Sequence, residues 1–186
     1  MQKKKFSLTQ LIFMALMAAV MCIAGPLAVP IGPVPITLTN LVIYIAVWVL
    51  GTAQGTISYC LYLLLGMVGL PVFSGYAGGL GKLAGPTGGY LIGFIAMALI
   101  GGIVMEVSHR KLIPTLIGWF IGTAVDYLFG TLWFMYIMHT TFMQTMAACD
   151  FPFIIGDCIK LIAGVMLGRQ LHKILVHAGF IKTAVA

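Results

Sequence analysis

The chain has 186 residues, of which 61% are hydrophobic and only 8% are charged. About a quarter of the residues of an ordinary soluble domain are charged, and a disordered chain is rich in charge and poor in aromatics, so both classes are excluded. We therefore expect an all-α integral membrane protein. The net charge of +6 indicates orientation in the membrane and not a nucleic-acid partner, since Lys and Arg of membrane proteins gather on one side.

Successive apolar runs predict a single transmembrane domain, residues 1–186, built as a bundle of six helices. A spanning helix needs about 20 apolar residues, so the length leaves no room for a large water-facing domain. The first run follows three lysines and is interpreted as a retained span, not as a signal peptide. The predicted spans are 7–24, 37–50, 54–69, 89–106, 113–136 and 153–175. Irregular connections, rich in Gly and Pro at the first two, are predicted at 25–36, 70–88 and 137–152.

The basic residues predict which way the bundle faces. Eight of the ten Lys and Arg residues fall on the side of the two termini. The positive-inside rule then places both termini in the cytoplasm and the three irregular loops outside the cell membrane, where we expect a ligand to enter. These eight residues are Lys3, Lys4, Lys5, Arg110, Lys111, Arg169, Lys173 and Lys182.

Small residues recur at a spacing of four, which lets helix backbones approach closely in lipid. Such a pair is interpreted either as packing within the bundle or as a docking face for another membrane protein. The pairs are Ala15/Ala19, Gly51/Gly55, Gly118/Gly122 and Gly164/Gly168.

Asp157 and Lys160 are the strongest candidates for a binding site, because charge inside a membrane is costly and marks function. Their spacing of three places them on one face of a helix, where they are able to pair. Pro152 and Gly156 suggest that this helix begins just before Asp157, whose charge the positive end of the helix would then favour. A structural ion pair is the alternative interpretation. Asp126, midway along the fifth span, either approaches this pair or hydrogen-bonds to a neighbouring helix.

The glycine-rich stretch from Gly69 to Tyr90 permits tight turns and close approach of the backbone to a ligand. Phe73, Tyr76 and Tyr90 are candidates for its flat apolar walls. The pattern Gly79-Leu-Gly-Lys-Leu-Ala84 is a weak dinucleotide-like match, which we reject because no strand precedes it. The sequence shows no Walker A motif, no metal-ligand spacing and no nucleophile–base constellation, so we expect no ATP site, no metal, no cofactor and no enzymatic activity.

Three segments together resemble the BioY family, the biotin-binding S components of energy-coupling-factor (ECF) transporters. They are Pro33-Val-Pro-Ile-Thr37-Leu, then Gly69-Leu-Pro-Val-Phe-Ser-Gly75 with Gly85-Pro-Thr-Gly-Gly-Tyr90, and Gly156-Asp157-Cys-Ile-Lys160. The likeness covers nearly the whole chain in order and length. One departure is Thr39-Asn40, where many relatives carry a glutamine.

The resemblance implies a six-helix subunit that binds biotin from outside and works with a transmembrane coupling protein (T component) and two cytoplasmic ATPases. It implies that Ala15 and Ala19 face the coupling protein. Asp157 and Lys160 would meet the ureido group of biotin; alternatively, Lys160 meets the valerate carboxylate. Thr37, Asn40, Gly75, Gly78 and Gly79 are further candidate contacts, beside the three aromatic residues of the loop.

Two other functions compete with this one. The chain is alternatively an independent secondary transporter or channel for biotin or another small nutrient, or else a membrane enzyme or assembly factor. A self-sufficient carrier would transport when reconstituted alone, whereas an S component would bind with little turnover unless its partners were present.

Overall fold

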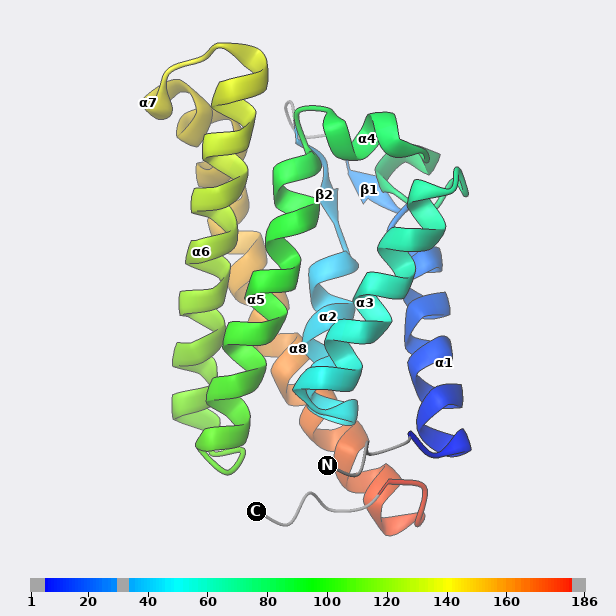
Figure 1. The fold of residues 1–186 in the computed structure, drawn as a ribbon. Helices are drawn as coiled ribbons and strands as arrows, with labels where there is room; N and C mark the ends of the chain where they lie inside the picture. The colour runs from blue at the N-terminus through cyan, green and yellow to red at the C-terminus, as the bar shows by residue number, and fades with distance from the viewer. Residues whose placement is uncertain (1–5, 30–33, 182–186) are drawn as a thin grey trace, which may run out of the picture.

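The computed structural model describes residues 6–29 and 34–181 as a bundle of roughly aligned helices (Figure 1). The first helix, α1 (Leu8–Ala24), begins at Ser7, where the side chains of Ser7 and Gln10 form a reciprocal capping box. Two short strands, β1 (Ala28–Val29) and β2 (Ile36–Thr37), then pair antiparallel, with Ala28 opposite Thr37. β2 leads directly into the bundle and so positions the start of the second helix.

The remaining helices follow in chain order with few interruptions. Gly51 separates α2 (Thr39–Leu50) from α3 (Thr52–Met67), and its φ of 89° is a conformation that favours glycine. A 3₁₀ turn (Ser74–Tyr76) and the short α4 (Leu80–Ala84) precede α5 (Gly88–Val107). The chain then forms α6 (Leu112–Met138), α7 (Phe142–Thr145), a π-helical turn (Met146–Asp150) and α8 (Phe151–His177).

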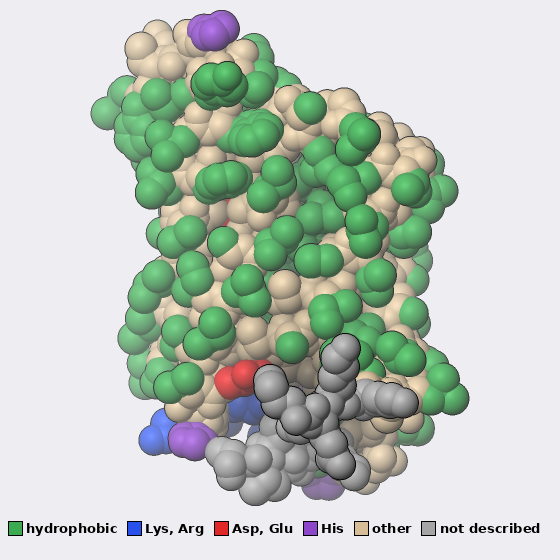
Figure 2. All heavy atoms as spheres, in the orientation of Figure 1, with side chains coloured by type: hydrophobic (Ala, Val, Ile, Leu, Met, Phe, Trp, Pro, Cys, Tyr) green, Lys and Arg blue, Asp and Glu red, His purple; other side chains and the backbone are tan. Residues whose placement is uncertain are grey.

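The bundle has two distinct ends. α1 begins and α8 ends at one of them, which we call the terminal end; α4 and α7 lie at the opposite, loop end (Figure 1). Arg110, Lys111, Arg169 and Lys173 belong to the segments at the terminal end. Hydrophobic side chains cover the visible face between the two ends (Figure 2). This distribution is typical of a protein surrounded by lipid.

Three helical segments are long and apolar enough to cross a membrane: Gly88–Val107, Leu112–Met138 and Phe142–His177. The last of these shows that the predicted loop 137–152 is largely helical, because α7 and the π-helical turn continue into α8. Likewise, the predicted loop 70–88 contains α4. The polar residues that suggested a loop at 137–152 include Thr145 and Asp150, which are both buried in this helical segment.

Glycines set the closest helix contacts. α5 and α6 form the most extensive helix pair, and α2 packs along α8. A Cβ added at Gly164 would lie 2.9 Å from Tyr44 Cβ, and one added at Gly168 would lie 2.6 Å from Trp48 Cβ. These two glycines therefore bring α8 against α2 within the chain, as the packing interpretation of the four-residue spacing predicts.

Candidate functional site

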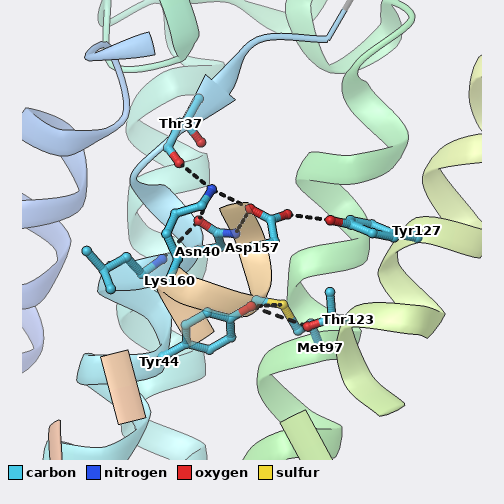
Figure 3. Close-up of polar contacts among 9 residues, drawn as sticks. Thr37, Asn40, Tyr44, Met97, Thr123, Tyr127, Asp157 and Lys160 are labelled. Atoms are coloured by element: carbon cyan, nitrogen blue, oxygen red, sulfur yellow. Dashed lines mark hydrogen bonds and ion pairs between the residues drawn. The ribbon is translucent and has the colours of Figure 1, made fainter. Parts of the chain in front are cut away.

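The end of β2, the start of α2 and the second and third turns of α8 bring together a compact polar cluster, which we define as Thr37, Asn40, Asp157 and Lys160 (Figure 3). Lys160 Nζ forms an ion pair with Asp157 Oδ1, and their side chains are only 14% and 13% exposed. Asn40 Nδ2 donates a hydrogen bond to the same Asp157 oxygen at 3.0 Å. The cluster therefore joins residues more than a hundred positions apart in the chain.

The ammonium group of Lys160 is fully engaged within the cluster. It donates to the backbone carbonyl of Thr37 at 3.0 Å and to Asn40 Oδ1 at 3.2 Å, besides its ion pair with Asp157. A lysine ammonium has three N–H donors, so these three acceptors account for all of them. The charges of Lys160 and Asp157 also balance each other.

A tyrosine from a third helix completes the surroundings of Asp157. Tyr127 of α6 donates its hydroxyl to Asp157 Oδ2 at 2.6 Å (Figure 3). Next to this bond lies a cavity of about 130 Å³ between α6 and α8, whose lining is nearly all apolar. Its lining residues are Phe120, Thr123, Ala124, Tyr127, Ile154, Asp157, Cys158 and Leu161.

A second group of hydroxyls lies deeper along the same helices. Tyr44 of α2 shares a hydrogen bond of 3.3 Å with Thr123 Oγ1, and its hydroxyl also contacts Met97 Sδ at 3.6 Å (Figure 3). Thr123 lines the cavity beside Asp157. Thr123 of this group and Asp157 of the polar cluster therefore line the same cavity.

The position of Asp157 in its helix differs from the expectation. α8 begins at Phe151 and follows α7 and the π-helical turn with little interruption, so Asp157 lies in the second turn and not at a free helix end. The electrostatic effect of a helix N-terminus falls off within the first turn. The ion pair and the two side-chain donors, not the helix dipole, therefore stabilise its charge.

The three predicted aromatic residues lie apart from the polar cluster. Phe73 is fully buried and packs edge-on against Tyr62, with its ring over Gly66. Tyr90 donates its hydroxyl to Asp150 Oδ1 at 3.0 Å. Tyr76 is 67% exposed at the loop end. Phe73 and Tyr90 thus have partners within the fold.

The loop glycines allow backbone conformations and close backbone contacts that other residues would not permit. Gly79 has a φ of 89°, and its N–H donates to the carbonyl of Gly66 at 2.7 Å. A Cβ on Gly78 would lie 2.4 Å from the carbonyl oxygen of Leu70. Gly75 also has a positive φ. The loop is therefore folded back onto the end of α3.

Asp126 is buried in α6, and in the described part of the chain neither of its carboxyl oxygens has a hydrogen-bond partner. It faces α5, where a Cβ on Gly93 would lie 2.3 Å from Asp126 Oδ1. Asp126 does not hydrogen-bond to the polar cluster, although the adjacent Tyr127 does.

Two candidate site residues, Tyr127 and Asp150, were not identified from the sequence. Tyr127 binds Asp157, and its spacing of four from Thr123 on α6 was the signal that could have identified it. Asp150 was placed in a loop, yet it accepts hydrogen bonds from Tyr90 and, at 2.6 Å, from Thr131. Nothing in the local sequence predicts that a residue of this segment turns into the bundle.

Ala15 and Ala19 are exposed on α1, on a different face from the buried Met14, Ala18 and Met21. α1 packs on α2 and α3 through its buried side. The pair at Ala15/Ala19 is therefore free of the intramolecular packing that involves Gly164 and Gly168.

Comparisons with known proteins agree with one another. The family model described as the BioY family matches residues 1–177. The chain is 34% identical to the biotin transporter BioY2 of Lactococcus lactis subsp. cremoris, with 94% of each chain covered. It is 32% identical to the biotin transporter BioY of Thermotoga maritima, with 90% of this chain and 98% of the relative covered.

A solved structure shares both fold and sequence with the chain. The crystal structure of the S-component for biotin from an ECF-type ABC transporter superimposes with a TM-score of 0.81 at 33% identity. The match covers 88% of this chain and 90% of the other. On these grounds, the chain belongs to the BioY family.

Proposed function

We propose that this chain is the biotin-binding S component of an ECF-type uptake transporter, and not an enzyme. The observation that carries the proposal is the polar cluster, in which α2 and α8 present donors and an acceptor side by side in an otherwise apolar membrane protein. The chain belongs to the BioY family, whose relatives are named biotin transporters, and biotin is therefore the proposed ligand.

The chemistry of the cluster suits the ureido group of biotin, which has two N–H donors and one carbonyl acceptor. Asp157 is the acceptor for an N–H, and Lys160 or Asn40 Nδ2 is the donor to the carbonyl. In the structure these groups satisfy one another, so none is left buried and unpaired. A ligand that lacks one ureido group would leave a partner unsatisfied, which gives the site its specificity.

The apolar part of biotin needs apolar surroundings, and the cavity beside Asp157 supplies them. At about 130 Å³ this cavity is smaller than the roughly 300–1,000 Å³ of typical ligand pockets. We infer that the site widens when biotin enters, while the segment 70–88 covers the ligand. Phe73 and Tyr90 would then hold the scaffold of the site, since both have partners inside the protein.

The proposal includes six membrane spans, formed by α1, α2, α3, α5, α6 and α8. The positive-inside rule supports cytoplasmic termini, since Arg110, Lys111, Arg169 and Lys173 belong to the terminal end. The loop end then faces outward, and β2 and α4 lie on the path of an incoming ligand. α2 has only 12 residues, so it would cross the membrane together with the adjoining β2 segment.

Energy coupling is assigned to partners. The sequence carries no ATP-binding motif, so a transmembrane T component and two cytoplasmic ATPases would supply the energy. The exposed pair Ala15/Ala19 on α1 is the proposed contact with the T component, because small residues let a partner helix approach closely.

Uptake of labelled biotin by cells that lack their own biotin transport tests this function. We expect uptake when this chain is produced with a T component and ATPases, and little uptake when it is produced alone. Equal uptake without partners would identify an independent transporter. No biotin uptake by well-expressed protein with functional partners would contradict the proposal.

A further inference from the structure

Lys82, a basic residue at the loop end, has no role in the proposed function so far. Among the basic residues that the structure describes, only Lys82 and Lys160 lie toward this end (Figure 1). Lys82 belongs to α4 and is half-buried. In the described part of the chain, its ammonium forms neither an ion pair nor a side-chain hydrogen bond, whereas Lys160 has three acceptors.

Biotin, the ligand of the proposed function, carries a negative charge at the end of its valerate chain. Lys160 is poorly suited to this carboxylate, because Asp157 already balances its charge. A second carboxylate at this place would lie beside Asp157, and like charges at short range repel. An enclosed carboxylate therefore needs another cation.

Lys82 is held on a well-anchored element of the loop end, α4. α4 lies at the loop end, in contact with α3 and α5 (Figure 1). The Gly79–Gly66 hydrogen bond fixes the start of α4. A Cβ on Gly88 would lie only 1.6 Å from the carbonyl oxygen of Leu83, so α5 holds the other end at close range.

The surroundings of Lys82 leave its charge undercompensated. Burial lowers the pKa of its ammonium group, because the charged form loses hydration. A bound carboxylate would form an ion pair with the ammonium group and so compensate for the hydration that it has lost. The ligand would thus bridge a polar cluster at the start of α2 and a single cation on α4.

We propose that Lys82 binds the carboxylate of the ligand, while the polar cluster binds its ureido end. This assignment rests on the proposed function and makes Lys82 a specificity-determining residue. It also selects between the two roles considered for Lys160, which then meets the ureido group.

Comparing biotin with biotinamide, in which the carboxylate becomes a neutral amide, tests this assignment in the purified full-length protein. We expect the protein to bind biotin roughly tenfold to a hundredfold more tightly, as for a charge-assisted hydrogen bond. Lys82→Gln should lower the affinity for biotin by about that factor and leave biotinamide binding unchanged. Lys173→Gln, at an exposed lysine of the terminal end, is the matched control.

The outcomes separate this inference from the proposed function. If the native protein binds neither compound, the proposed function fails. If it prefers biotin and Lys82→Gln keeps that preference, Lys82 is not the carboxylate partner. Retained biotinamide binding also shows that the Lys82→Gln protein is folded.

A second measurement uses the native protein, so it tests the assignment even if the Lys82→Gln variant does not fold. The N-hydroxysuccinimide ester of biotin acylates an amine near its tail, forming an amide and releasing N-hydroxysuccinimide. We expect mass spectrometry to find the label on Lys82, and excess biotin to prevent it. Labelling of Lys160 in preference to Lys82, or labelling of Lys82 that biotin does not prevent, would overturn the assignment.

Discussion

Asn40 Nδ2 and Asp157 Oδ1 lie 3.0 Å apart, although 117 positions separate the two residues in the chain. This contact depends on the close packing of α2 against α8 at Gly164 and Gly168. It shows how the fold builds the polar cluster: one helix pair, with small residues along its seam, brings an amide and a carboxylate together inside the bundle.

Asp157→Asn should weaken biotin binding about tenfold or more, because the variant loses both the ion pair with Lys160 and a charged acceptor for a ureido N–H. Calorimetric titration of the purified protein measures the change. Asp126→Asn is the matched control, since Asp126 has no hydrogen bond to the cluster, and we expect an affinity close to that of the native protein. An unchanged affinity in Asp157→Asn would assign Asp157 a purely structural role.

Tyr127→Phe tests whether the hydroxyl on Asp157 Oδ2 positions the carboxylate. Removing one hydrogen bond of about 1 kcal/mol should weaken biotin binding roughly fivefold. Tyr136→Phe changes a side chain that is 79% exposed on the same helix, and it should leave the affinity unchanged. Equal affinities in the two variants would remove Tyr127 from the site.

Gly168→Ala should destabilise the protein, because the added Cβ would lie 2.6 Å from Trp48 Cβ. Such overpacking costs about 1–3 kcal/mol and should lower the unfolding temperature in detergent. At Gly156, on the same helix, an added Cβ meets nothing within 4 Å, so Gly156→Ala should preserve or raise that temperature. The reverse order of the two variants would contradict the packing of α8 on α2.

Replacing Ala15 and Ala19 by Trp should prevent association with the T component while leaving biotin binding intact. Both alanines are exposed on α1, so the larger side chains would block a partner helix without entering the bundle. Co-purification with the T component and ATPases measures association. Leu128 and Leu132 have the same spacing on α6 and are 53% and 52% exposed, so their replacement by Trp is the control. Normal association of the alanine variant would exclude this face as the contact.

The sequence predicted those features of the fold that depend on local composition. Its apolar runs indicate a helical membrane protein, and the spacing of Asp157 and Lys160 places them on one helix face. The continuation of α7 into α8 was missed, because Thr145 and Asp150 are polar residues whose burial depends on contacts with distant helices. Local polarity cannot report such contacts.

The same distinction applies to the candidate site. Intramembrane charge identified Asp157 and Lys160, and the resemblance to BioY added Thr37 and Asn40, which the structure brings into contact with them. Phe73 and Tyr90 were chosen for their aromatic surface, which serves a core as well as a ligand. Their partners, Tyr62 and Asp150, are set by tertiary packing that the sequence pattern does not encode locally.

Titration of the detergent-purified protein with biotin, with thiamine and riboflavin in parallel, tests the central claim most directly. Intrinsic fluorescence or calorimetry reports the binding. We predict tight, stoichiometric binding of biotin and none of the other two vitamins. Failure of correctly folded protein to bind biotin, or tighter binding of thiamine or riboflavin, would contradict the assignment of the polar cluster as a biotin site.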